Sequence, residues 1–106
     1  PPHIRQLTAE FKTAMQQLYG ERLAGVILYG SYARGDYTED SDVDLLVVLR
    51  GEDVERLALH NSPARVVNQL FDQYNELVSP FIVPEMRYQQ SDFLFYRNVR
   101  REGITL

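Results

Sequence analysis

The feature that most constrains the fold is a pair of short apolar runs separated by a polar crossing. The runs are Ala24–Tyr29 and Ser41–Leu49. Both are short and bounded by turn-forming residues, so both are predicted as β-strands. Within the crossing, Tyr32 to Gly35 is predicted as a short helical turn that ends at Gly35, and Asp36 to Asp40 as a polar loop. The residues of the crossing should therefore gather at one end of a sheet.

Helical periodicity dominates the rest of the chain. A helix is predicted over Ile4–Tyr19, and further helical segments are predicted over 53–60, after Pro63, after Pro84 and over 92–102. A third strand is predicted over Leu77–Val83, where Pro80 indicates an edge position or a bulge. This order predicts an α/β (α+β) domain with a small mixed sheet and with helices packed mainly on one face.

The size of the chain limits what it does alone. Its 106 residues predict one domain, 1–106, with no room for a separate substrate-binding domain. A second substrate must therefore be presented largely by a partner or by a homo-oligomer. The net charge of −4 argues against broad nucleic-acid binding, and the absence of cysteine excludes disulfides, thiolate metal sites and cysteine catalysis. We see no signal peptide and no apolar run long enough for a membrane, so a cytoplasmic location is expected.

Two aspartates stand at the start of the second predicted strand. Side chains alternate along a strand, so Asp42 and Asp44 should project side by side while Val43 points to the other face. Adjacent carboxylates suit a hard divalent cation, and Mg²⁺ is usually held by one or two carboxylates plus substrate phosphates. An Asp-x-Asp pair alone is weak evidence, because polar residues are common on the open face of a strand.

The crossing itself opens with Gly30 and Ser31. Glycine lets a backbone approach an anion closely, and a serine at a helix start offers a hydroxyl and free N–H groups to phosphate oxygens. The compatible structural reading is a strand-ending turn with a helix cap. A Walker A loop is rejected because Asp36 and Tyr37 stand where it requires lysine and Ser/Thr. Arg34 is a candidate phosphate contact, a solvated arginine or a partner of a loop aspartate.

Taken together, the segment Gly30–Leu49, GSYARGDYTEDSDVDLLVVL, resembles the nucleotidyltransferase signature of the polymerase β superfamily. Gly30 and Ser31 are followed by ten residues and then by Asp42, Val43 and Asp44. The sequence of this segment is similar to that of the minimal nucleotidyltransferases, small bacterial and archaeal proteins often paired with a HEPN-type partner. The resemblance implies a polymerase β-like core, two Mg²⁺ ions, and transfer of a nucleoside monophosphate from ATP or another nucleoside triphosphate. It also implies an antitoxin role in which the acceptor is a tyrosine of a HEPN toxin.

The resemblance further implies a third carboxylate on a neighbouring strand. The predicted strand Leu77–Val83 contains no aspartate, and Glu76 is the nearest acid. Alternation along the strand could place Glu76 on the same face of the sheet as the two aspartates. Glu76 is therefore the candidate third catalytic carboxylate, and Glu85 is a weaker substitute. The competing interpretation is a solvated helix-end glutamate.

Two other functions stay open at this point. If no third carboxylate reaches the metal, the chain would be a degenerate nucleotidyltransferase that neutralises a partner by contact alone. Modification of a small molecule such as an aminoglycoside is less favoured, because no second domain is present to hold it.

Overall fold

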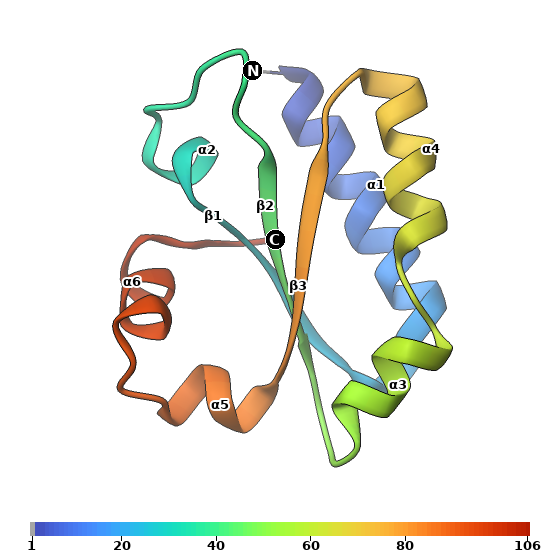
Figure 1. The fold of residues 1–106 in the computed structure, drawn as a ribbon, viewed down its shortest axis with the longest axis vertical. Helices are drawn as coiled ribbons and strands as arrows, with labels where there is room; N and C mark the ends of the chain where they lie inside the picture. Colours follow the sequence, from blue (N-terminus) through green and yellow to red (C-terminus); the bar gives the residue numbers. More distant parts are fainter. Residues whose placement is uncertain (1) are drawn as a thin grey trace.

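The computed structural model describes residues 2–106, which form a mixed α/β fold around a four-stranded sheet (Figure 1). The helices are α1 (Pro2–Tyr19), α2 (Ser31–Arg34), α3 (Val54–His60), α4 (Ala64–Tyr74), α5 (Glu85–Gln90) and α6 (Leu94–Glu102), with a 3₁₀ turn at Gly20–Arg22. The strands are β1 (Leu23–Tyr29), β2 (Val43–Leu49), β3 (Val78–Pro84) and β4 (Ile104–Thr105). The predicted fold class is confirmed.

The sheet has the strand order β3-β2-β1-β4. β1 and β2 run antiparallel, whereas β2 and β3 run parallel because α3 and α4 carry the chain back between them. β3 is an edge strand, as Pro80 predicted, since a proline that lacks an N–H is tolerated at an edge.

Alternation along β2 divides the apolar side chains between two cores. Val43, Leu45, Val47 and Leu49 belong to the larger core, which α1, α3 and α4 cover. Leu46 and Val48 belong to a smaller core beneath α6. Figure 1 shows α1 and α4 on one side of the sheet and α5 and α6 on the other. Helices therefore cover both faces, with the larger core on the α1 side.

The structure adds one strand that the sequence did not predict. β4 has only two residues, and it pairs Ile104 with Leu28 and Thr105 with Ile27. A two-residue strand is too short to show alternation, so periodicity does not detect it. β2 also begins at Val43 rather than at Ser41, which leaves Asp42 just before the strand.

No helix within residues 2–106 combines the length and apolar character needed to span a membrane.

Candidate active site

The end of β1 and the start of β2 bring Gly30 against Asp44. Asp44 is the register partner of Tyr29, the last residue of β1. Gly30 has φ +76°, a conformation that favours glycine, and a Cβ placed on it would lie 2.3 Å from Oδ2 of Asp44. The missing side chain of Gly30 therefore makes the room that the Asp44 carboxylate occupies.

The short helix α2 follows directly and holds two predicted phosphate contacts. The carbonyl oxygen of Gly30 accepts hydrogen bonds from the N–H groups of Ala33 and Arg34, both at 3.1 Å. Gly35, at φ +89°, ends the turn by donating its N–H to the carbonyl of Ser31 at 2.8 Å. This turn places Ser31 and Arg34 along one cavity with Asp44.

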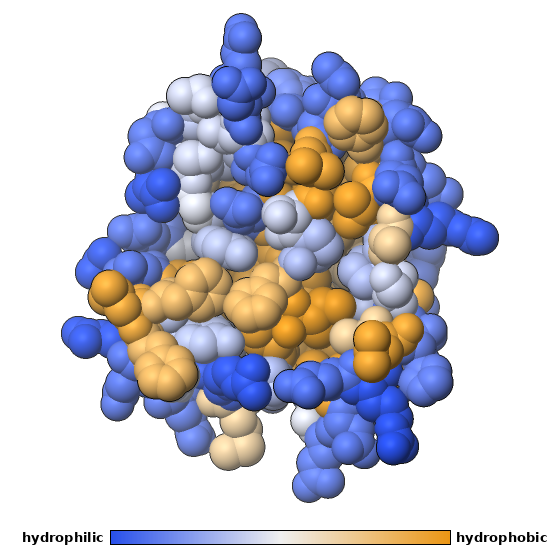
Figure 2. Space-filling model, viewed as in Figure 1, coloured by the Kyte–Doolittle hydropathy of each residue, from blue (hydrophilic) through white to orange (hydrophobic). Residues whose placement is uncertain are grey.

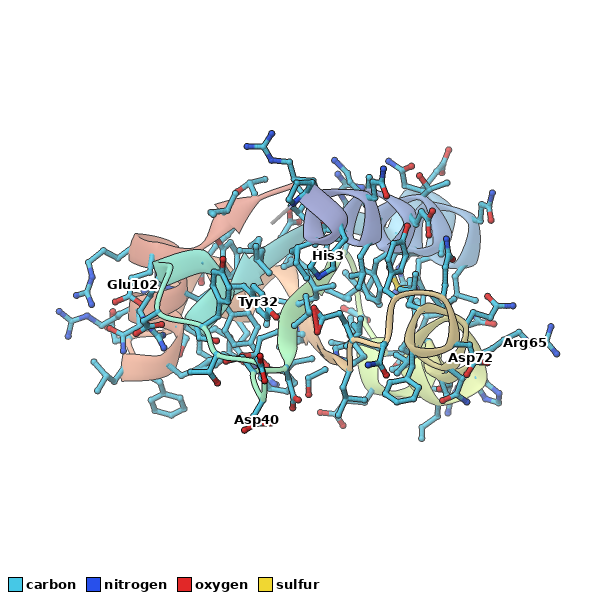
Figure 3. The ribbon with its side chains drawn as sticks, turned by 90° about the horizontal axis from the view of Figure 1, so that it is seen from above. His3, Tyr32, Asp40, Arg65, Asp72 and Glu102 are labelled. Carbon is cyan, nitrogen blue, oxygen red and sulfur yellow. The ribbon has the colours of Figure 1, made fainter. Side chains whose placement is uncertain are left out.

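That cavity has a volume of about 380 Å³ and lies between the crossing and α6. Tyr29, Gly30, Ser31, Arg34 and Asp44 line it from one side, and Phe95, Asn98, Val99 and Glu102 line it from α6. Figure 3 shows Glu102 on the α6 side of the sheet and His3 on the α1 side. The candidate site is thus on the α6 face.

The negative charges of the two neighbouring aspartates repel each other in the folded protein. Asp42 is exposed and Asp44 is half-buried. Burial raises the pKa of Asp44, the nearby charge of Asp42 raises it further, and Arg34 acts in the opposite direction. Within residues 2–106 neither carboxylate forms a hydrogen bond or an ion pair with the protein. A bound cation would relieve this repulsion.

Two carboxylates are too few for a metal site built wholly from protein ligands, but they suit a magnesium ion. Across the described residues no group of three or more His, Cys, Asp and Glu side chains is placed to hold a metal. Mg²⁺ tolerates such a site because it keeps waters and takes phosphate oxygens beside one or two carboxylates. The space that Gly30 leaves for Asp44 is consistent with this fit.

Arg34 reaches across the cavity mouth. Its Nε lies 3.3 Å from Oδ2 of Asp36, and its Nη1 lies 3.8 Å from Oε2 of Glu102. The pairing with Asp36 that the sequence suggested is therefore present. With the arginine side chain 45% exposed, both pairs are weak enough to be exchanged for contacts with a phosphate.

Glu76 is not brought to the aspartates. Asp44 pairs with Ser79 in the parallel register, whereas Val43 pairs with Val78, so Ser79 shares the face of Asp44 and Glu76 has the phase of Val78. The Glu76 carboxylate accepts a hydrogen bond from the Tyr32 hydroxyl at 3.2 Å and lies 3.0 Å from Nε2 of His3. It thus faces α1 and lines a separate cavity of about 740 Å³.

Glu85, the weaker substitute, begins α5 after the far end of β3 and lines neither of these two cavities. The register between β2 and β3 decides the placement of Glu76, and this register cannot be derived from the alternation within one strand.

Sequence reasoning missed the α6 wall of the cavity. Phe95, Asn98, Val99 and Glu102 recur at i, i+3, i+4 and i+7, the spacing of one helical face. The sequence contains this helical spacing, but the same spacing is typical of any helix face that packs against a core.

Comparison with known proteins gives a consistent family. Residues 8–99 match the family model of the nucleotidyltransferase domain. "Putative protein adenylyltransferase MJ0604" of Methanocaldococcus jannaschii is 35% identical over 98 residues, which cover 92% of this chain and 91% of that protein. MJ0141 of the same organism, which carries the same descriptive name, is 35% identical over 79 residues, or 74% of this chain and 78% of that protein.

Proposed function

The chain belongs to the nucleotidyltransferase domain family, and from this we propose that it transfers AMP from ATP to a hydroxyl group of another protein. The observation that carries the proposal is a pair of neighbouring carboxylates without internal partners. Asp44 lines a cavity together with Ser31 and Arg34, and the charge of Asp42 is near enough to raise the pKa of Asp44. The choice of AMP is supported by the names of its relatives, which are called protein adenylyltransferases.

The proposed reaction is a nucleotidyl transfer. The acceptor oxygen forms a bond to the α-phosphorus, the bond from that phosphorus to the oxygen bridging to the β-phosphorus breaks, and pyrophosphate leaves with the electron pair. The hydroxyl proton passes to solvent. Asp42 and Asp44 would hold Mg²⁺, which supplies charge neutralisation on the phosphates when bound. Ser31 and Arg34 would orient the outer phosphates of ATP.

The acceptor that we propose is a tyrosine of a HEPN-type toxin, which makes this chain an antitoxin. The support is the resemblance noted above, together with the names of the relatives, which are called protein adenylyltransferases. ATP is a cytoplasmic metabolite, so we expect the reaction in the cytoplasm.

The test is transfer of α-labelled ATP, with Mg²⁺, onto a HEPN-type protein from the same genome. The wild type should label the partner, and the double variant Asp42→Asn/Asp44→Asn should not. Asp72→Asn is a matched control, because it makes the same chemical change at an exposed position of α4 remote from the cavity (Figure 3). Equal labelling by the double variant would contradict the proposal.

One observation favours a second candidate, a binding module without transfer. Among the described residues no third acidic side chain is positioned to hold a metal ion together with Asp42 and Asp44. If the double variant still neutralised the toxin as fully as the wild type, contact alone would account for the function. Loss of neutralisation together with loss of labelling would instead favour the enzyme.

A further inference from the structure

The cavity beside Asp44 has two chemically different ends. Gly30, Ser31, Arg34 and Asp44 form a polar end with the character of a phosphate site. The opposite end comes from α6 and contains the ring of Phe95, the side chain of Val99 and the amide of Asn98. A triphosphate alone accounts for the first end and leaves the second without a ligand.

Phe95 is held in place yet remains available for contact. Its ring centroid lies 5.5 Å from Tyr29, 5.6 Å from Phe81 and 5.1 Å from Tyr96. The corresponding interplanar angles are 89°, 66° and 84°, so none of these three rings stacks parallel to it. Phe95 also stays 38% exposed.

This ring belongs to a wider hydrophobic surface. Figure 2 shows apolar side chains gathered over α6 and β3, where Phe81, Phe93, Leu94 and Phe95 are all exposed. Among these four residues only Phe95 lines the cavity. Its position therefore combines a fixed aromatic ring with access to whatever occupies the site.

Asn98 lies one helical turn further along the same face of α6. Its Oδ1 accepts a hydrogen bond from Nη2 of Arg101 at 3.1 Å. Within residues 2–106 its Nδ2 has no hydrogen-bond partner, so this N–H donor is free to bind an acceptor in the cavity.

We propose that the α6 end binds the nucleobase of the nucleoside triphosphate: Phe95 stacks on the flat face of the base, and Nδ2 of Asn98 donates a hydrogen bond to an acceptor atom on its edge. The assignment rests on the proposed function, because it requires a nucleotide in this cavity. A base has an apolar face and a hydrogen-bonding edge, which are the two properties that Phe95 and Asn98 complement. The acceptor hydroxyl must instead approach the α-phosphorus from the side opposite to the departing pyrophosphate.

The experiment compares two ligands that share phosphates but differ in the base. Calorimetric binding of α,β-methylene-ATP and of inorganic tripolyphosphate, both with Mg²⁺, is measured for each variant. Phe95→Leu keeps the apolar bulk but removes the ring, and it should weaken the ATP analogue about tenfold. Asn98→Ala should weaken it about fivefold. Neither variant should change binding of tripolyphosphate, whereas Ser31→Ala should weaken both ligands.

Phe93→Leu is the matched control, because Phe93 is 75% exposed, lies outside the cavity and should leave both affinities unchanged. Wild-type affinity of Phe95→Leu and Asn98→Ala for the ATP analogue would overturn the base assignment while leaving the proposed function standing. A wild type that binds neither ligand would overturn both. Equal weakening of both ligands by Phe95→Leu would show that the ring supports the whole cavity, which also contradicts a base contact.

Discussion

Asp44 and Glu76 lie near the same end of the sheet but on opposite faces, and their surroundings differ. Asp44, on the α6 face, and Asp42, just before β2, have no hydrogen-bonding or ion-pairing partner within residues 2–106. Glu76, on the α1 face, is bonded to Tyr32 and lies beside His3, with its side chain only 13% exposed. A carboxylate with internal partners contributes to the fold, whereas one left without partners is available to a ligand.

The helix α2 separates these two regions. Ser31 lines the cavity on the α6 face, and its neighbour Tyr32 donates its hydroxyl to Glu76 on the α1 face. Tyr32 also stacks on Tyr37, with ring centroids 4.6 Å apart and planes inclined by 12°. The α1-side contacts therefore anchor the helix that carries Ser31 and Arg34.

The largest effect should come from removing either unpartnered charge. Asp42→Asn and Asp44→Asn should each lower kcat/KM by about a thousandfold or more, because the phosphates would lose the metal that neutralises them. The check is a steady-state transfer assay beside circular dichroism to verify folding. Activity within tenfold of the wild type in either variant would contradict the assignment of a catalytic role to the aspartates and a structural role to Glu76.

A slightly smaller loss should follow from filling the space that Asp44 occupies. A Cβ in Gly30→Ala would meet Oδ2 of Asp44 at 2.3 Å and would also be strained at φ +76°, so activity should fall about a hundredfold. Gly35→Ala is the control for a positive φ alone: Gly35 is left-handed at φ +89°, and its Cβ would meet nothing within 4 Å. In thermal unfolding Gly35→Ala should lose about 1–2 kcal/mol of stability. Gly30→Ala should lose more, because its φ and ψ of +76° and −153° suit essentially only glycine, and it alone should lose activity.

Arg34→Ala should have an intermediate effect. Loss of the proposed contact between its guanidinium and a phosphate should raise the KM for ATP about tenfold, with a smaller change in kcat. Arg65→Ala, on α4 away from the cavity, is the control (Figure 3). An unchanged KM in Arg34→Ala would mean that the pairs with Asp36 and Glu102 are the whole role of this residue.

Glu76→Gln should act on stability rather than on chemistry. The amide can still accept the hydrogen bond from Tyr32 but loses the charge beside His3, so we expect a loss of about 0.5 kcal/mol and a change in kcat/KM below about threefold. The two measurements are thermal unfolding and the transfer assay. A loss of activity as large as that of Asp44→Asn would place Glu76 in the reaction.

The smallest effect concerns stability and pH. The pKa of Asp44 is raised in the folded protein, so folding favours the protonated form of this side chain. The contribution of the protonated form to the stability of the fold is present below the ordinary pKa of 3.8. It is lost as the pH rises through the folded pKa. Asp44→Asn should therefore be more stable than the wild type at pH 7, by about 1–3 °C in the unfolding midpoint, and this difference should vanish near pH 3. A less stable variant at pH 7 would contradict the unfavourable charge.

The comparison also explains which parts were predictable from sequence. Gly30, Ser31 and Asp44 belong to one local segment, so the turn and the following strand were enough to bring them to one cavity, whereas Asp42 precedes β2 and does not line it. The place of Glu76 depends on the register between β2 and β3, and the role of Phe95 depends on how α6 packs against the sheet. Both are long-range relations that no local pattern contains. β4 was missed because two residues carry no period.

The most direct test of nucleotidyl transfer compares ATP labelled at the α-phosphate with ATP labelled at the γ-phosphate. With the acceptor protein and Mg²⁺ present, we predict that the α-label appears on the acceptor, that the γ-label is released as pyrophosphate, and that Asp42→Asn/Asp44→Asn does neither. Label on the acceptor from the γ-phosphate, or equal α-labelling by the double variant, would contradict nucleotidyl transfer at the two aspartates.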